Sequence, residues 1–158
     1  MEKYLIEKIV LQKKPLSKYG FEYKKNDNGV DPVGDEFIEF DSNVFHSRKI
    51  GIKVYYLKRN DICFYHIQCK IEKITDKVVE GEDVSLYILS FLNEKMIEYT
   101  KDKFLIYFEN SIDLENKINA SFDYLETLFD TNEELNKIIK GEYWEYRTTN
   151  WNMFGGHK

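Results

Sequence analysis

The sequence predicts an α+β fold: an antiparallel sheet of about four to five strands, with an N-terminal helix and two to three C-terminal helices packed on one face. Segments in which apolar residues alternate are grouped between residues 19 and 74, and most segments with helical spacing come after residue 83. Strands grouped before helices are typical of an antiparallel sheet that is covered on one face. No strand–helix–strand alternation indicates a parallel sheet.

A single domain spanning residues 1–158 is the expected organisation, because 158 residues is an ordinary size for one domain. Residues 148–158 follow the last expected helix and are interpreted as a C-terminal extension. We expect Trp151 and Phe154 of this extension to fold back onto the core, because aromatic side chains left in water favour aggregation. The last residues, GGHK, are expected to be loose.

The first expected element is a short amphipathic helix in EKYLIEKIVLQKK, residues 2–14. Its apolar residues fall on one side of a helix; they are Leu5, Ile6, Ile9 and Val10. Pro15 ends this helix, because the residue before a proline disfavours the helical conformation. YGFEYKK then alternates as a strand does, and the NDNG sequence at 26–29 indicates a turn.

Two further strand regions follow. In EFIEFD, residues 36–41, Phe37 has the opposite parity to Ile38 and Phe40. Residues 49–74 predict a hairpin around KRND, in which position 56 pairs with 63, 54 with 65 and 52 with 67. This register places both apolar sets on one face, and a slip of two residues would preserve that face. The face of the hairpin is therefore better determined than its register.

The second half predicts helices. DVSLYILSFLNEKMIEY, residues 83–99, is apolar almost all round, which is typical of a buried helix. KFLIYFE is expected to be a short strand. Asn110 or Ser111 then caps a helix whose apolar stripe has clean helical spacing. That stripe consists of Leu114, Ile118, Phe122, Leu125 and Phe129.

A last helix is predicted to open with a capping box formed by Thr131 and Glu134. Its apolar residues are Leu135, Ile138, Ile139 and Tyr143. We expect this helix to continue to about Arg147. The aromatic residues near its end are candidates for contact with a partner.

Motifs for cofactors and metals are missing from the sequence. It contains no GxGxxG, no P-loop and no cysteine–histidine spacing typical of zinc, so no cofactor and no metal centre is predicted. Glu39 and Asp41 share a strand face and could together hold Mg²⁺. The following strand lacks the acid-x-Lys element of a nuclease, and a charged solvent-facing or edge strand is the favoured interpretation.

One catalytic alternative remains open. His66 and His46 could form an acid–base pair, as in metal-independent RNA cleavage, with Lys53 or Lys70 stabilising a phosphorane. Two histidines and a lysine often share a sheet by chance, so the favoured interpretation is an ordinary strand residue and a loop residue. The sequence therefore favours a protein that is not an enzyme over a small phosphodiesterase.

Charge is distributed unevenly along the chain. The formal net charge is −5. Residues 1–79 carry 15 basic against 12 acidic residues, and residues 80–158 carry 8 against 16. A negative field over the second half attracts basic partners and repels nucleic acid. The predicted contact residues on the C-terminal helices are Glu115, Asp123, Glu126, Asp130, Glu133 and Glu134, with Trp144 and Tyr146 as aromatic anchors.

These observations favour a non-catalytic domain that binds a basic protein partner. In size, acidity and fold class the chain is similar to small bacterial immunity proteins, which neutralise toxins. A homo-oligomer whose aromatic residues form its own interface is a further alternative. No apolar run approaches the roughly 20 residues that span a membrane, and charges interrupt the N-terminus, so a cytoplasmic location without membrane contact is expected.

Overall fold

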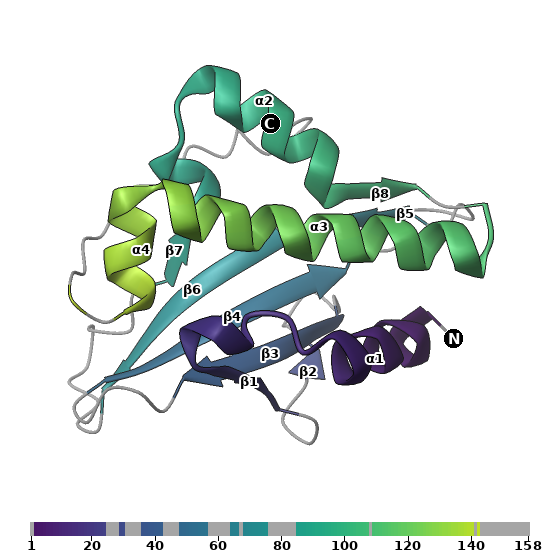
Figure 1. Cartoon of the computed structure of the whole chain (residues 1–158), viewed down its shortest axis with the longest axis horizontal. Coiled ribbons are helices and arrows are strands. Elements are labelled where there is room, and N and C mark those ends of the chain that lie inside the picture. The colour runs from purple at the N-terminus through teal and green to yellow at the C-terminus, as the bar shows by residue number, and fades with distance from the viewer. Residues whose placement is uncertain are drawn as a thin grey trace.

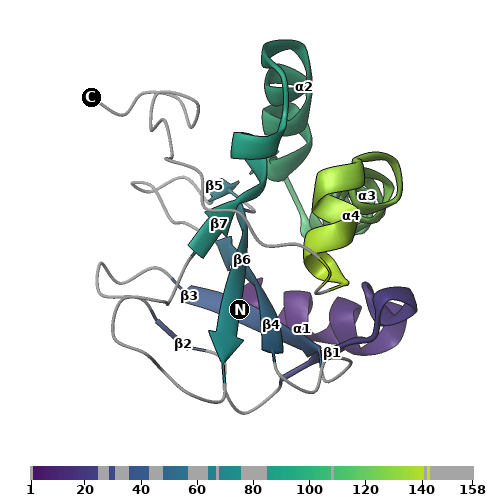
Figure 2. The same ribbon diagram turned by 90° about the vertical axis from the view of Figure 1, so that its left-hand side faces the viewer.

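The computed structural model describes residues 2–24, 29–30, 36–42, 48–56, 64–66, 68–75, 85–107, 109–140 and 142. The predicted α+β class is confirmed: helices cover one side of an antiparallel sheet (Figures 1 and 2). The aromatic residues Trp144, Tyr146, Trp151 and Phe154 lie outside the described residues, as does His46.

The main sheet has six strands, with the order β1-β3-β4-β6-β7 and with β2 also paired to β3. Their bounds are β1 Phe21–Tyr23, β2 Gly29–Val30, β3 Glu36–Ser42, β4 Arg48–Tyr56, β6 Gln68–Thr75 and β7 Ser85–Tyr87. The predicted number of four to five strands is thus not confirmed. Strands β2 and β7, which were not predicted, are only two and three residues long, which is too short for alternation to reveal.

The hairpin register differs from the prediction by four residues. Ile52 pairs with Ile71 and Val54 with Cys69, where positions 67 and 65 were expected. The predicted face is nevertheless preserved, because side chains alternate with a period of two and an even slip changes no parity. Because β4 pairs with residues 68–75, residues 64–66 are not part of this pairing. They form β5, Phe64–His66, which pairs with β8, Leu105–Tyr107, in a separate two-stranded sheet.

The described helices form a layer on one side of the sheet (Figure 2). Their bounds are α1 Glu2–Lys13, α2 Glu94–Phe104, α3 Ser111–Thr131 and α4 Glu133–Ile139, with short 3-10 helices η1 at Ser17–Tyr19 and η2 at Ile88–Phe91. The first helix ends just before Pro15, as predicted. In α3 the side chain of Asn110 accepts a hydrogen bond from the backbone N–H of Asp113 at 2.9 Å, so Asn110 is the cap.

The core lies between α3 and the helix-facing side of the sheet. Every residue of the predicted α3 stripe is buried, from Leu114 to Phe129. Phe122 meets Phe40 of β3 edge to face, with ring centroids 5.8 Å apart. Ile38 and Phe40 are buried on this side, whereas Phe37 on the other side is only partly buried, as its parity predicts.

The prediction of one buried helix over residues 83–99 is wrong. The described part of this segment forms β7, then η2, and only then α2. Leu92 is extended, and the side chain of Asn93 accepts a hydrogen bond from the N–H of Met96 at 2.9 Å, which starts α2. An all-round apolar segment predicts burial, but it carries no helical stripe that would distinguish a helix from a buried extended segment.

Both ends of the last helix also differ from the prediction. Asn132, and not Thr131, caps α4, because its side chain accepts the N–H of Leu135 at 3.0 Å. The hydroxyl of Thr131 donates instead to the carbonyl of Thr127 within α3. The helix ends at Ile139, well before Arg147. A glycine follows Lys140 in the sequence, and glycine is the commonest residue just after a helix end.

Candidate functional site

The acidic helix α3 packs against the basic N-terminal segment, which we define as residues 2–19. This segment carries five lysines and two glutamates, whereas α3 carries five acidic residues and one lysine. Both views of the molecule show α1 alongside α3 (Figures 1 and 2). Opposite charges of the two halves therefore meet inside the same chain.

Three of the predicted contact residues take part in this packing. Lys13 Nζ lies 2.8 Å from Asp123 Oδ1, and Lys18 Nζ lies 2.7 Å from Asp130 Oδ2. The carboxylate of Glu126, between these two on the same face of α3, accepts the backbone N–H of Leu16 at 2.7 Å. Asp123, Glu126 and Asp130 therefore bind the N-terminal segment, which leaves them less available to another protein.

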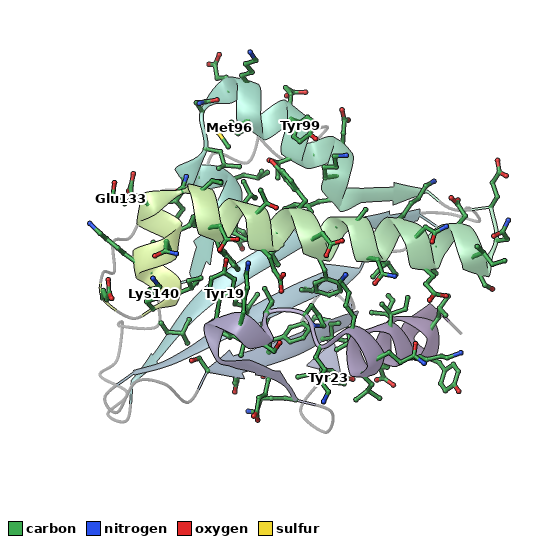
Figure 3. All side chains as sticks on the ribbon, in the orientation of Figure 1. Tyr19, Tyr23, Met96, Tyr99, Glu133 and Lys140 are labelled. Atoms are coloured by element: carbon green, nitrogen blue, oxygen red, sulfur yellow. The ribbon has the colours of Figure 1, made fainter. Side chains whose placement is uncertain are left out.

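Tyr19 strengthens the junction between η1 and α3 (Figure 3). Its hydroxyl donates to Asp130 Oδ1 and lies 3.0 Å from the carbonyl oxygen of Glu126, and its ring meets Phe129 edge to face at 5.7 Å. Burial, followed by the hydrogen bond to Asp130, raises the pKa of Tyr19. The hydrogen bond from Lys18, followed by that from Tyr19, lowers the pKa of Asp130.

The lowered pKa of Asp130 predicts a stability difference that depends on pH. A carboxylate whose pKa is lower in the folded state stabilises it above the unfolded pKa of about 3.9, and this contribution disappears as the pH falls through the folded value. Asp130→Asn is therefore expected to lower the urea midpoint at pH 7 and to lower it by a smaller amount at pH 3. Asp102→Asn, which removes the charge of an exposed aspartate on α2, is the control. A difference for Asp130→Asn that is equally large at both pH values would contradict this assignment.

The other three predicted acidic residues, Glu115, Glu133 and Glu134, lie elsewhere on α3 and α4. Glu115 is exposed near the start of α3, and Glu133 is exposed on α4, where it pairs with Lys137 at 3.2 Å (Figure 3). Glu134 is partly buried beside it. A helix rises about 1.5 Å per residue, so Glu115 lies roughly 25 Å from Glu133 along α3. The structure thus separates Glu115 from the other two.

Glu94, which was not predicted from the sequence, begins the helix that follows the segment beside the start of α4. The side chain of Asn132 donates to the carbonyl of Phe91 at 3.3 Å, which brings the start of α4 next to the segment that leads into α2. Glu94 is the first residue of α2 and is exposed. We call the surface formed by Glu94, Glu133 and Glu134 the α2–α4 end. Only the fold, and no spacing in the sequence, brings the start of α4 next to the segment that leads into α2.

Glu39 and Asp41, which were considered above as a Mg²⁺ site, lie on the side of the sheet that faces away from the helices. Glu39 and Asp41 are buried, with exposed fractions of 9% and 5%, which corrects the favoured interpretation of a solvent-facing strand. Asp41 Oδ2 lies 2.8 Å from Lys24 Nζ, and Glu39 pairs in register with Lys53. Gly51 leaves the room that the Asp41 carboxylate occupies, since a Cβ there would lie 3.1 Å from Oδ1. Lysines therefore stand beside both carboxylates.

Of the two histidines in the catalytic alternative, only His66 lies in the described part of the chain. The backbone of His66 belongs to β5 and pairs with Leu105, so His66 is not on the second strand of the predicted hairpin. Lys53 of β4 and Lys70 of β6 are partners in the backbone register of the main sheet. Among the described residues, no three His, Cys, Asp or Glu side chains are grouped as metal ligands would be.

No protein-family model, curated protein or solved structure matches this sequence. Within the described ranges, none of the helices combines the length and apolar character needed to cross a membrane. Functional inference therefore depends on the residues and their arrangement.

Proposed function

We propose that this chain is a non-catalytic protein-binding domain that recognises a basic partner, in the manner of the bacterial immunity and inhibitor proteins that neutralise toxins. The proposal is supported by one observation above all. The N-terminal segment binds part of the acidic surface of α3, and the α2–α4 end carries a separate acidic group of exposed Glu94, exposed Glu133 and partly buried Glu134.

The α2–α4 end is the contact surface in this proposal. Carboxylates that are exposed on one side of a molecule steer an oppositely charged partner during diffusion and fix its orientation. Glu115, about 25 Å away along α3, contributes to the long-range field more than to the contact. Trp144 and Tyr146 follow within four residues of Glu142 in the sequence and remain the proposed aromatic anchors.

Affinity capture from a lysate of the source organism tests this proposal. The bound fraction is washed at low and at high salt and is identified by mass spectrometry. We expect one stoichiometric basic protein, with association slowed by salt because opposite charges are screened within about 10 Å at 0.1 M. No partner at either salt would contradict the proposal, and a doubled mass in light scattering would then favour a homo-oligomer.

A further inference from the structure

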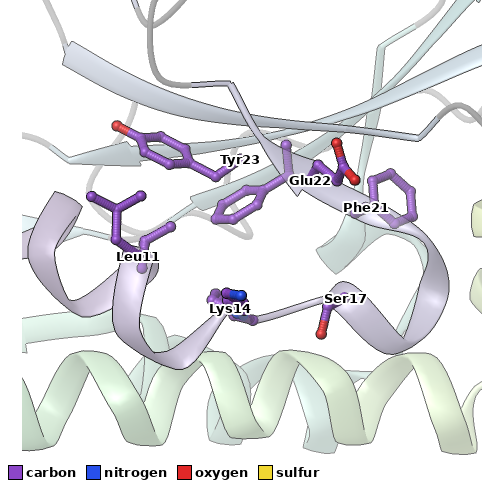
Figure 4. Close-up of a pocket in the computed structure, with 9 residues that line it drawn as sticks. Leu11, Lys14, Ser17, Phe21, Glu22 and Tyr23 are labelled. Carbon is purple, nitrogen blue, oxygen red and sulfur yellow. The ribbon is translucent and has the colours of Figure 1, made fainter.

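A pocket of about 360 Å³ lies at one end of the main sheet, between the end of α1 and strand β1 (Figure 4). Apolar side chains of α1, β1 and β3 line it, namely Val10, Leu11, Phe21 and Phe40. Phe21 and Phe40 are buried, whereas Leu11 is half exposed. Pockets that bind small molecules typically measure about 300–1,000 Å³, so this one suits a ligand at the small end of that range.

Two charged residues, Lys14 and Glu22, border this pocket, but Glu22 brings no charge to its apolar interior. Glu22 alternates with Phe21 and Tyr23 along β1 and pairs in register with Asp41. Successive side chains of a strand point to opposite faces, so the carboxylate of Glu22 lies on the face away from the apolar lining. Among the described residues that line the pocket, Lys14 is therefore the one whose charge is left for a ligand.

The turn that carries Lys14 has unusual backbone conformations. Lys14 and Leu16 both have positive φ angles, 49° and 65°, which residues other than glycine adopt infrequently. The turn is held in place because Leu16 is fully buried and donates its N–H to Glu126 at 2.7 Å. The N–H of Ser17 also donates to the carbonyl of Lys14, at 3.4 Å. Strained backbone that neighbouring groups hold fixed is often found at ligand sites.

The lysines around this turn differ in their partners. Lys13 and Lys18 form ion pairs with aspartates of α3. Lys14, in contrast, pairs with no carboxylate among the described residues, and it lines the pocket together with Ser17 on the connection between α1 and η1 (Figure 4). Lys14 thus brings an unpaired positive charge to an apolar pocket, and the hydroxyl of Ser17 on the same edge can donate a further hydrogen bond.

We propose that this pocket binds a small monocarboxylate with an aryl or alkyl body. The carboxylate of the ligand pairs with the ammonium group of Lys14 and accepts a hydrogen bond from the hydroxyl of Ser17. The apolar body packs among Leu11, Phe21 and Phe40, and its removal from water favours binding. The ion pair with Lys14 selects an anion, because a neutral molecule leaves the ammonium group without a partner and a cation is repelled by it.

A titration of the ¹⁵N-labelled protein, followed by NMR, tests this proposal with four probes at pH 7. Hydrocinnamate is expected to shift the backbone N–H signals of Leu11, Lys14 and Tyr23. Hydrocinnamamide has the same body without the charge and is expected to bind about threefold more weakly, the size of effect that a partly exposed ion pair provides. Phenylpropylamine has the opposite charge and is expected to bind more weakly than the amide. Acetate has the charge without the body and is expected to bind about tenfold or more weakly than hydrocinnamate.

Two variants of Lys14, an exposed residue, assign the selection of an anion to this side chain. Lys14→Gln is expected to abolish the preference for hydrocinnamate over its amide, and Lys14→Glu to reverse the order so that phenylpropylamine binds more tightly than hydrocinnamate. Lys95→Gln, at an exposed position of α2, is the matched control and should preserve the wild-type order. The absence of any shift at millimolar hydrocinnamate would overturn the proposal. Equal binding of hydrocinnamate and its amide to the wild type would also overturn it, because the site would then be only an apolar cavity.

Discussion

Replacing Phe122 by alanine is expected to lower the free energy of unfolding by about 3–5 kcal/mol, the range for deletion of a buried aromatic ring. Phe122 is buried in the middle of α3 and meets Phe40 of β3 edge to face. Its removal takes away a contact that joins the helical layer to the sheet and leaves a cavity that the rigid strands cannot fill. The measurement is urea unfolding followed by circular dichroism.

Thr127→Ala is the matched control, because Thr127 is exposed on the same helix. An exposed substitution of this kind usually changes the free energy of unfolding by less than about 0.5 kcal/mol. A loss below about 1 kcal/mol for Phe122→Ala would mean that α3 does not pack on the sheet as described.

Glu126→Ala is expected to cost about 1–3 kcal/mol, the usual penalty for leaving a buried polar group without its partner. The backbone N–H of Leu16 is that group, since Leu16 is fully buried and its donor is bound to the Glu126 carboxylate at 2.7 Å. The turn at Leu16 has a positive φ angle, so loss of this bond also weakens a strained segment. Urea unfolding gives the stability change.

Two variants separate this hydrogen bond from the loss of a charge on α3. Glu126→Gln retains an oxygen that can accept the Leu16 N–H, so it is expected to cost less than Glu126→Ala. Glu115→Ala removes an exposed carboxylate from the same helix and should have little effect. Equal losses for Glu115→Ala and Glu126→Ala would show that helix charge, and not the bond to Leu16, determines the result.

The fold could be predicted in those segments where the apolar residues follow a single spacing, either that of a helix or that of a strand. The α3 stripe follows from helical spacing, and Asn110 is one of the two residues predicted to cap the helix. Pro15 marks the end of α1 for a covalent reason, since proline restricts the residue before it. The core face of β3 and β4 follows from the period of two.

Features set by tertiary contacts could not be predicted. The hairpin register is one, because slips of two or four residues bury the same face and β5 gains a distant partner in β8. The secondary structure of the segment before α2 could not be predicted either, because an apolar run is equally compatible with a buried strand and a buried helix.

The candidate site shows the same division between local pattern and tertiary contact. The charge difference between the two halves predicts a surface that attracts basic groups. The sequence gives no sign that some of these groups belong to the chain itself, at Lys13 and Lys18. Glu94 was missed because its neighbours on the α2–α4 end lie about 40 residues away in the sequence.

The most direct test of the proposed binding surface is the association rate of the captured partner at low salt, measured for two charge-matched variants. One carries Glu133→Lys and Glu134→Lys at the α2–α4 end, and the other carries Glu98→Lys and Asp102→Lys on exposed positions of α2. Glu133 and Glu98 each pair with a lysine on their own helix, so each variant changes one residue of such a pair. We predict a rate about tenfold lower for the first variant and a much smaller change for the second, because steering depends on where the charge lies. Equal changes in both variants would contradict the proposal, since the partner would then respond only to total charge.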